Sequence, residues 1–311
     1  MPAMALEGLH HITAITADAP ANVDFYARTL GLRLVKKTVN FDAPDVYHLY
    51  YGDEAGSPGS ILTFFEFPGA APGRAGAGML HSIVWRVGTD AALDFWAGRL
   101  AGEGVAVTRE ANRLRFADPE GLGLELAHVD SGDPPLVAAA ADIPAEHALQ
   151  GFDGARAYTT APERSAALLG ETLQFEHEGD GDWICAGEER GARWSYDPPP
   201  PERGVQGAGT VHHIAWAAPD ADHEAWRKAV AAAGAHVTPV IDRQYFFSIY
   251  FREPSGVLFE IATLGPGFAT DEDPAHLGEA LRLPPQHEHL RAQLERTLTP
   301  LHNPRATEVS S

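Results

Sequence analysis

The chain contains little cysteine, little lysine and no long apolar run. Cys185 is the only cysteine among its 311 residues, which excludes an intramolecular disulfide. Lysine and arginine together number 23 against 43 aspartates and glutamates, so the formal charge is −20 at pH 7. Such a surface repels the phosphates of nucleic acids and of anionic lipids. We therefore expect neither a nucleic acid nor a membrane surface as a partner.

Signals for export or membrane insertion are also absent from the sequence. The start, MPAMALEGLH, has neither the basic region nor the apolar stretch of a secretory signal. No segment reaches the roughly 18 consecutive apolar residues that a membrane-spanning helix requires. Together with the single cysteine, these features predict a protein of the reducing cytoplasm.

Histidine, by contrast, is abundant, and two adjacent pairs of it stand in a repeated motif. The 15 histidines include the pairs in LHHITAITAD, residues 9–18, and in VHHIAWAAPD, residues 211–220. Each motif alternates as a strand does and precedes a helix-like segment, residues 21–30 and 223–233. Runs rich in β-forming residues, separated by turn signals, follow both segments. The repeat therefore predicts a β-α-β-β-β module.

Two further copies of this module lie between the outer two, and the second of them is the weaker. The four modules span residues 7–67, 78–128, 150–197 and 208–264. Because the helix covers only one face of such a small sheet, the modules should pair. We predict an α+β fold in which four βαβββ modules form two cup-shaped mixed sheets. We expect an N-terminal domain, residues 1–143, and a C-terminal domain, residues 144–311, with a helical tail from residue 265 to 311.

One histidine of each pair is a candidate metal ligand. Successive residues of a strand point to opposite faces, and His11 and His213 have the smaller neighbours on their own faces, which leaves room for a ligand. Glu260, in GVLFE, supplies a carboxylate from the last strand of the fourth module. Two imidazoles and one carboxylate with open positions are typical of non-haem Fe(II), and Mn(II) also suits them. The repeat sets Thr63 of the first module at the place of Glu260. The middle modules align Ser82, Glu125, Arg156 and Ser195 with His11, Thr63, His213 and Glu260, and those residues cannot hold such an ion.

Five motifs distributed along the chain carry a family resemblance. They are LHHIT at 9–13, YHLYYGD at 47–53, VHHIA at 211–215, GVLFE at 256–260 and GFATDEDP at 267–274. With these motifs the chain resembles the vicinal oxygen chelate superfamily, and within it the ring-cleaving dioxygenases similar to hydroquinone dioxygenases. The resemblance implies iron ligands at the second histidine of each pair and at the strand-end glutamate, which here are His11, His213 and Glu260.

The resemblance also implies polar groups around the metal. The matching positions are His10, Thr13, His212, Arg243 and Tyr250. Thr13 fits because it shares a strand face with His11, whereas alternation turns His10 and His212 away unless their strands start irregularly.

Tyr250 and Arg243 each have a second interpretation. The segment Arg252–Gly256 reads as a hairpin loop, which sets Tyr250 nearly opposite Glu260. In the run YFFSIYF, however, Tyr250 could equally be an aromatic core residue. Arg243 could equally be a surface charge paired with Asp242.

The function that the resemblance implies is cleavage of a dihydroxylated aromatic ring, a hydroquinone or a catechol, by O₂ at Fe²⁺. The same scaffold also supports glyoxalase-type isomerases or lyases that use Zn, Ni or Mn, and small-molecule sequestering proteins of antibiotic resistance. The complete His-His-Glu set argues against a sequestering protein. The sequence leaves open the exact substrate, the choice between Fe²⁺ and Mn²⁺, and whether the chain forms a homo-oligomer.

Overall fold

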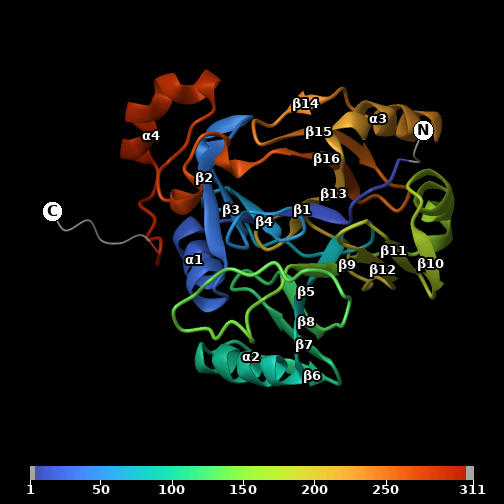
Figure 1. Ribbon diagram of the computed structural model, residues 1–311, viewed down its shortest axis with the longest axis horizontal. Coiled ribbons are helices and arrows are strands. Elements are labelled where there is room, and N and C mark those ends of the chain that lie inside the picture. The colour runs from blue at the N-terminus through green and yellow to red at the C-terminus, as the bar shows by residue number, and fades with distance from the viewer. Residues whose placement is uncertain (1–3, 306–311) are drawn as a thin grey trace.

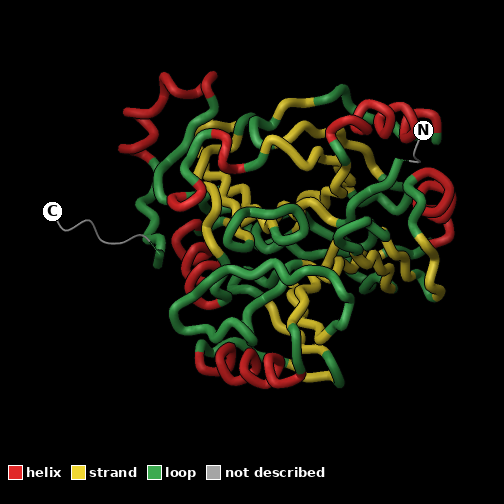
Figure 2. The backbone as a smooth tube through the Cα atoms, viewed as in Figure 1, coloured by secondary structure: helices red, strands yellow, loops and turns green. Residues whose placement is uncertain are grey.

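The computed structural model describes residues 4–305, whose strands form two eight-stranded mixed sheets (Figures 1 and 2). The strands follow the order β14-β15-β16-β13-β1-β4-β3-β2 in the first sheet and β10-β11-β12-β9-β5-β8-β7-β6 in the second. The first sheet contains β1 (Leu9–Thr16), β2 (Arg33–Asn40), β3 (Ala43–Gly52), β4 (Ile61–Glu66), β13 (Val211–Ala218), β14 (Ile241–Asp242), β15 (Phe246–Arg252) and β16 (Leu258–Pro266). The second contains β5 (Leu80–Val87), β6 (Thr108–Glu110), β7 (Arg113–Ala117), β8 (Gly123–His128), β9 (Phe152–Tyr158), β10 (Glu176–Gly179), β11 (Asp182–Cys185) and β12 (Ala192–Asp197).

Each module carries a helical segment between its first and second strands. The segments are α1 (Ala19–Val23) with η1 (Asp24–Thr29), α2 (Asp90–Gly102), η2 (Pro162–Ser165) with η3 (Ala167–Thr172), and η4 (Asp220–Asp222) with α3 (His223–Ala232). The first segment begins where the Asp18 carboxylate accepts a hydrogen bond from the Ala21 amide at 3.0 Å. It ends at Gly31, whose φ of 71° suits glycine at a helix C-terminus. The predicted α+β fold of four βαβββ modules is confirmed.

The modules that share a sheet are not neighbours in the sequence. The first sheet joins module 7–67 to module 208–264 through antiparallel pairing of β1 with β13. The second joins module 78–128 to module 150–197 through β5 and β9. The division expected at residue 143 therefore cuts through both sheets. The division does not follow the sheets because each module pairs with another through the edge of its first strand. The spacing of residues along the chain does not show which of these edges match.

The two sheets also share one hydrophobic core. It contains buried residues of all four modules, among them Ile12, Trp85, Trp194 and Trp216. The Trp194 and Trp216 rings, which belong to different sheets, lie 6.2 Å apart between centroids. The sheets are therefore packed against each other through their apolar faces, and the opposite face of the first sheet is left free to form a cup.

The tail after β16 closes one end of that cup. It forms η5 (Phe268–Thr270), η6 (Pro274–His276), η7 (Pro285–Leu290) and α4 (Arg291–Thr297), so the expected helix is present in short segments. Phe268 packs with Tyr50 and Phe246 of the cup wall. The fully buried Lys36 on β2 donates to the Phe268 carbonyl at 3.0 Å and contacts the carboxylates of Asp271 and Glu272.

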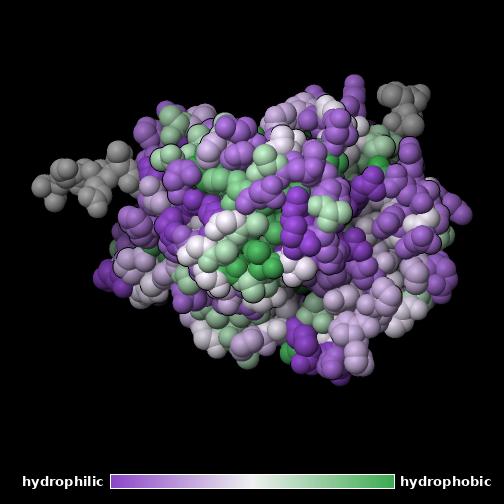
Figure 3. Space-filling model, turned by 90° about the horizontal axis from the view of Figure 1, so that it is seen from below, coloured by the Kyte–Doolittle hydropathy of each residue, from purple (hydrophilic) through white to green (hydrophobic). Residues whose placement is uncertain are grey.

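The surface is largely polar, as the composition predicts. The face seen in Figure 3 is mostly hydrophilic and carries an apolar area near its middle. Among the described residues no helix is both long enough and apolar enough to cross a membrane.

Replacement of Lys36 by methionine should destabilise the protein. The change removes the buried cation that Glu272 and Asp271 share and leaves Glu272 with only the half-exposed Arg282, whose Nε lies 3.3 Å away. Breaking a buried ion pair costs about 3–5 kcal/mol. Urea denaturation followed by circular dichroism measures the loss. The matched control is Lys37→Met, because the half-buried Lys37 side chain donates to the Glu279 carbonyl and forms no ion pair among the described residues. Equal midpoints for both variants would show that the tail is not anchored by Lys36.

Candidate metal centre

Three strands of the first sheet bring His11, His213 and Glu260 together in a buried cluster. The Glu260 Oε2 atom lies 3.2 Å from His11 Nε2 and 2.9 Å from His213 Nε2. The two Nε2 atoms are 3.3 Å apart. Register explains the meeting, because His213 lies opposite Thr13 on β1, and Glu260 lies beside Ala215 on β13. Among the described residues this is the cluster whose ligand atoms all lie within 4.8 Å of one another.

The donor set fits a divalent metal ion. Adjacent ligands about 2.1 Å from an octahedral ion are about 3 Å apart, which is close to the three distances observed. Burial acts to raise the pKa of Glu260, but His11 and His213 hold it well below its usual value. Burial lowers the pKa of His213, although Glu260 opposes this shift. A neutral imidazole and an ionised carboxylate are the forms that bind metals.

Both histidine pairs lie at β-bulges, so both members of each pair face the cup. On β1 the register shifts between Leu9 and His11, and on β13 it shifts at His212. Leu9 and Ile12, three residues apart, both belong to the shared core. Regular alternation would place Leu9 and Ile12 on opposite faces of the strand. The extra residue of the bulge brings both onto the same face. His10 and His212 are therefore turned toward the cup by the irregular start of each strand, which is the exception to alternation that the sequence left open.

The first histidine of each pair orients the second. His10 Nδ1 lies 2.9 Å from His11 Nδ1, and His212 Nδ1 lies 2.8 Å from His213 Nδ1. Each ligand thus has its Nε2 atom free for the metal, as in other sites where a second group holds the far ring nitrogen.

His10 and His212 occupy equivalent positions but different environments. Burial and His11 lower the pKa of His10 to about 3, and burial and His213 lower that of His212 to about 4. His10 is 3% exposed, whereas His212 is exposed and lines the pocket. Only His212 of the two can therefore reach a bound substrate.

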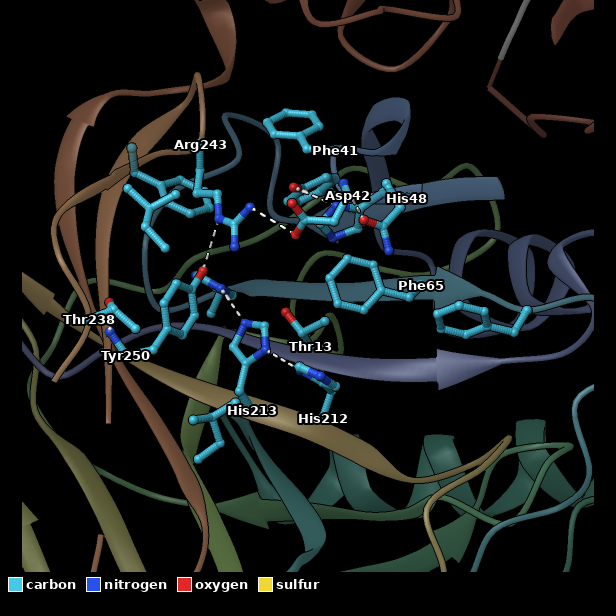
Figure 4. Close-up of a pocket in the computed structure, with 17 residues that line it drawn as sticks. Thr13, Phe41, Asp42, His48, Phe65, His212, His213, Thr238, Arg243 and Tyr250 are labelled. Carbon is cyan, nitrogen blue, oxygen red and sulfur yellow. Dashed lines mark hydrogen bonds and ion pairs between the residues drawn. The ribbon is translucent and has the colours of Figure 1, made fainter. Parts of the chain in front are cut away.

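Tyr250 and Arg243 stand together at the side of the site. Tyr250 lies directly opposite Glu260 in the β15–β16 hairpin, as the loop predicts. Its hydroxyl accepts a hydrogen bond from Arg243 Nε at 3.2 Å, and Arg243 Nη1 lies 3.3 Å from the Asp42 carboxylate across the pocket (Figure 4). Burial, reinforced by Glu260, raises the pKa of Tyr250 well above its usual value, so the phenol stays protonated. The alternative pairing of Arg243 with Asp242 is not observed among the described contacts.

A pocket of about 380 Å³ opens beside these groups. The phenylalanines on its walls are Phe41, Phe65, Phe67 and Phe246, and its polar lining includes Thr13, His212 and Arg243. Figure 4 shows Thr13 between His213 and Phe65. Volume and lining are those of a site for a small, planar molecule.

Sequence reasoning missed His48 and Tyr50, which also line this pocket. His48 Nε2 lies 2.8 Å from Thr63 Oγ1, and the Tyr50 hydroxyl lies 2.9 Å from His48 Nδ1. Both residues belong to the motif YHLYYGD. Its alternation sets them on the same strand face, and that signal could have identified them.

The second sheet has the same bulges without the ligands. Its register shifts at His81 on β5 and at Asp153 on β9. Ser82 then takes the place of His11, and Gly154 takes the place of His213. The alignment of Arg156 with His213 is therefore wrong by two residues.

The cavity of this second cup, about 630 Å³, contains ion pairs instead of metal ligands. Arg156 binds Asp197 through two bonds of 2.7 and 2.6 Å, and Asp197 also contacts His81 at 2.8 Å. Glu125 is held by Arg113 and Arg115.

Comparison with known proteins identifies the family. The family model described as the Glyoxalase/Bleomycin resistance protein/Dioxygenase superfamily matches residues 8–126 and 151–261. The chain belongs to this superfamily, which confirms the resemblance to vicinal oxygen chelate proteins.

The similar proteins carry dioxygenase names. The chain is 43% identical to the "Putative ring-cleaving dioxygenase MhqO" of Bacillus subtilis over 94% of this chain and 96% of that protein. It is 35% identical to the "Chlorohydroquinone/hydroquinone 1,2-dioxygenase" of Sphingobium indicum over 94% and 96%, respectively. A crystal structure of a "putative dioxygenase" from Bacillus subtilis superposes with a TM-score of 0.88 at 41% identity, covering 97% of this chain and 99% of that one.

Removal of a ligand side chain should abolish metal binding without unfolding the protein. We expect His213→Ala and Glu260→Ala to retain less than about a tenth of the metal bound by the unchanged protein, since each loses one of three protein ligands. Elemental analysis of the purified variants gives the metal content, and circular dichroism verifies the fold. His276→Ala, at an exposed histidine of the tail, is the control. A full equivalent of metal in both ligand variants would refute this ligand set.

Proposed function

We propose that this protein is a non-haem Fe²⁺-dependent ring-cleaving dioxygenase that opens a dihydroxylated aromatic, of the hydroquinone or catechol type, with O₂. The observation that carries the proposal is the buried His11, His213 and Glu260 set beside a pocket with aromatic walls. The names of the similar proteins support it. Mn²⁺ is the second metal that these ligands suit.

The metal, when bound by these three side chains, would lower the pKa of a coordinated substrate hydroxyl and supply the redox chemistry that O₂ requires. The protein's own contribution begins with the pocket. Phe65 and Phe246 present apolar ring surface on two sides, which favours a flat aromatic ring. Binding there places the substrate next to the ligand cluster and removes much of the entropic cost of their meeting.

Tyr250 and Arg243 would stabilise charge on an oxygen of the substrate. Because Tyr250 accepts its hydrogen bond from Arg243, its own hydrogen is free to be donated into the pocket. The guanidinium also lies 5.4 Å from the centre of the Tyr250 ring, which keeps a positive charge nearby. A donor and a cation fixed before the reaction stabilise developing negative charge efficiently.

His212 is the best placed group for proton transfer. Its Nδ1 atom is held by His213, and its ring packs 5.6 Å from that of Phe65. It is exposed at the pocket, so its remaining nitrogen can exchange protons with substrate and solvent. General acid or base catalysis by such a group contributes about 10²- to 10⁴-fold.

Anaerobic reconstitution tests the function. Protein loaded with Fe²⁺ should consume O₂ when a hydroquinone or catechol is added, with loss of the aromatic absorbance, and the metal-free protein should not. An oxygen electrode and an absorbance spectrum measure both changes. If the whole panel gives no O₂ uptake, while a thioester or epoxide is converted with another metal, the protein is a glyoxalase-type isomerase or lyase.

Tyr250→Phe should keep the metal and slow turnover. The change removes only the hydroxyl, so the substrate should still bind, and we expect kcat to fall by about 10- to 100-fold. Steady-state kinetics of the Fe²⁺-loaded variant give kcat and KM. Tyr47→Phe is the matched control, since the Tyr47 hydroxyl donates to the Thr299 carbonyl at 3.0 Å, away from the pocket. An unchanged kcat in Tyr250→Phe would show that the Tyr250 hydroxyl has no part in turnover and that the residue is structural.

A further inference from the structure

A continuous row of hydrogen bonds runs through the wall of the cup on the side of the first module. The Tyr50 hydroxyl lies 2.9 Å from His48 Nδ1, His48 Nε2 lies 2.8 Å from Thr63 Oγ1, and Thr63 donates to Thr13 Oγ1 at 3.0 Å. All four side chains are less than a tenth exposed. Burial of so many polar groups is costly unless they are paired, and here each is paired with the next.

The internal repeat shows where this row stands relative to the metal ligands. Thr63 lies opposite Tyr50 in the β3–β4 pair, just as Glu260 lies opposite Tyr250 in the β15–β16 pair. Thr63 thus occupies the place that the ligand Glu260 occupies in the fourth module. In the same comparison, His48 corresponds to Ser248, whose hydroxyl contacts Glu260. The first module therefore has a hydrogen-bonded row in the place of a metal ligand.

The row has a defined direction. The single hydrogen of the Thr63 hydroxyl is donated to Thr13, so Thr63 must accept from His48 Nε2. Burial lowers the pKa of His48 well below its usual value, so its ring carries one hydrogen, on Nε2. His48 Nδ1 must then accept from the Tyr50 hydroxyl.

This direction leaves the hydrogen of Thr13 free. Thr13 lines the pocket, lies opposite His213 in the β1–β13 pair and shares its strand face with His11. Its hydroxyl accepts from Thr63, and among the described residues its own hydrogen is donated to no side chain or carbonyl, so that hydrogen is available to a ligand in the pocket.

We propose that Tyr50, His48 and Thr63 are positioning residues that fix the Thr13 hydroxyl as a hydrogen-bond donor to an ionised hydroxyl oxygen of the aromatic substrate. This inference rests on the proposed function, which supplies the ligand as a dihydroxylated aromatic. A donor fixed in this way favours the phenolate over the neutral phenol, because a hydrogen bond to a charged oxygen is the stronger of the two. A hydroxyl that rotates freely could donate to a phenolate or accept from a neutral phenol, so it would favour the phenolate less.

The test follows ionisation of a bound probe instead of turnover. 4-Nitrocatechol changes colour when it loses a proton, so its pKa in the pocket can be read by absorbance on metal-loaded protein without O₂. In Thr63→Val the donation to Thr13 is lost and the Thr13 hydrogen can turn toward other partners. We expect the pKa of the bound probe to rise by about one unit. Thr13→Val should give the same rise.

Three further variants make the test specific. Thr63→Ser keeps the hydroxyl and should restore the probe pKa. The double variant Thr13→Val with Thr63→Val should be no worse than either single change, since both act through one hydrogen bond to the probe. Thr38→Val is the matched control, because the buried Thr38 hydroxyl, beside His48 on β2, has no hydrogen-bond partner among the described residues.

Two outcomes would overturn the proposal. One is a probe pKa that stays constant or falls in Thr63→Val while metal content and thermal stability are retained. The other is an additive double variant. A failure of the proposed function is distinguishable, because the unchanged protein would then bind the probe and shift its pKa but would consume no O₂ with any substrate of the panel.

Discussion

The antiparallel pairing of β1 with β13 is the interaction on which the site depends. It brings together histidines 202 residues apart, and a bulge on each strand turns both members of each pair into the cup. Without the bulges, His10 and His212 would point into the shared core and could not orient the ligands. The same bulges occur in the second sheet, at His81 and Asp153. They belong to the scaffold, and the metal site uses a geometry that the fold provides.

The two cups show how one scaffold separates structure from chemistry. In the first cup, burial and neighbouring charge leave His213 neutral and Glu260 ionised, so the polar groups can be satisfied by a divalent cation. In the second, arginines already neutralise the carboxylates of Glu125 and Asp197. The tail adds a further asymmetry, because Phe268 and the ion pairs of Lys36 close only the first cup.

Much of the fold and the candidate ligand set could be predicted from the sequence because both depend on repeated local patterns. The motifs around the two histidine pairs and GVLFE repeat with the module, and the hairpin loop correctly set Tyr250 opposite Glu260. The errors arose where a local rule was interrupted. A bulge inserts one residue without a sequence signature, so alternation failed at His10. The alignment of Arg156 failed because the third module has Asp153 and Gly154 where the fourth has its histidine pair, so no motif marked the position. His48 was missed because a single strand histidine is usually a core residue.

The sequence by itself determined the number and type of modules and the three candidate ligands, since these follow from periodicity and from the chemistry of the side chains. The ligand set implied that the first and fourth modules meet, but only the tertiary structure showed that they do so through β1 and β13, because that depends on which strand edges match after the chain has folded. It also decided the environment of each polar group. The pKa values of His10 and His212, the row from Tyr50 to Thr13 and the closing of one cup by the tail all result from burial among residues distant in sequence.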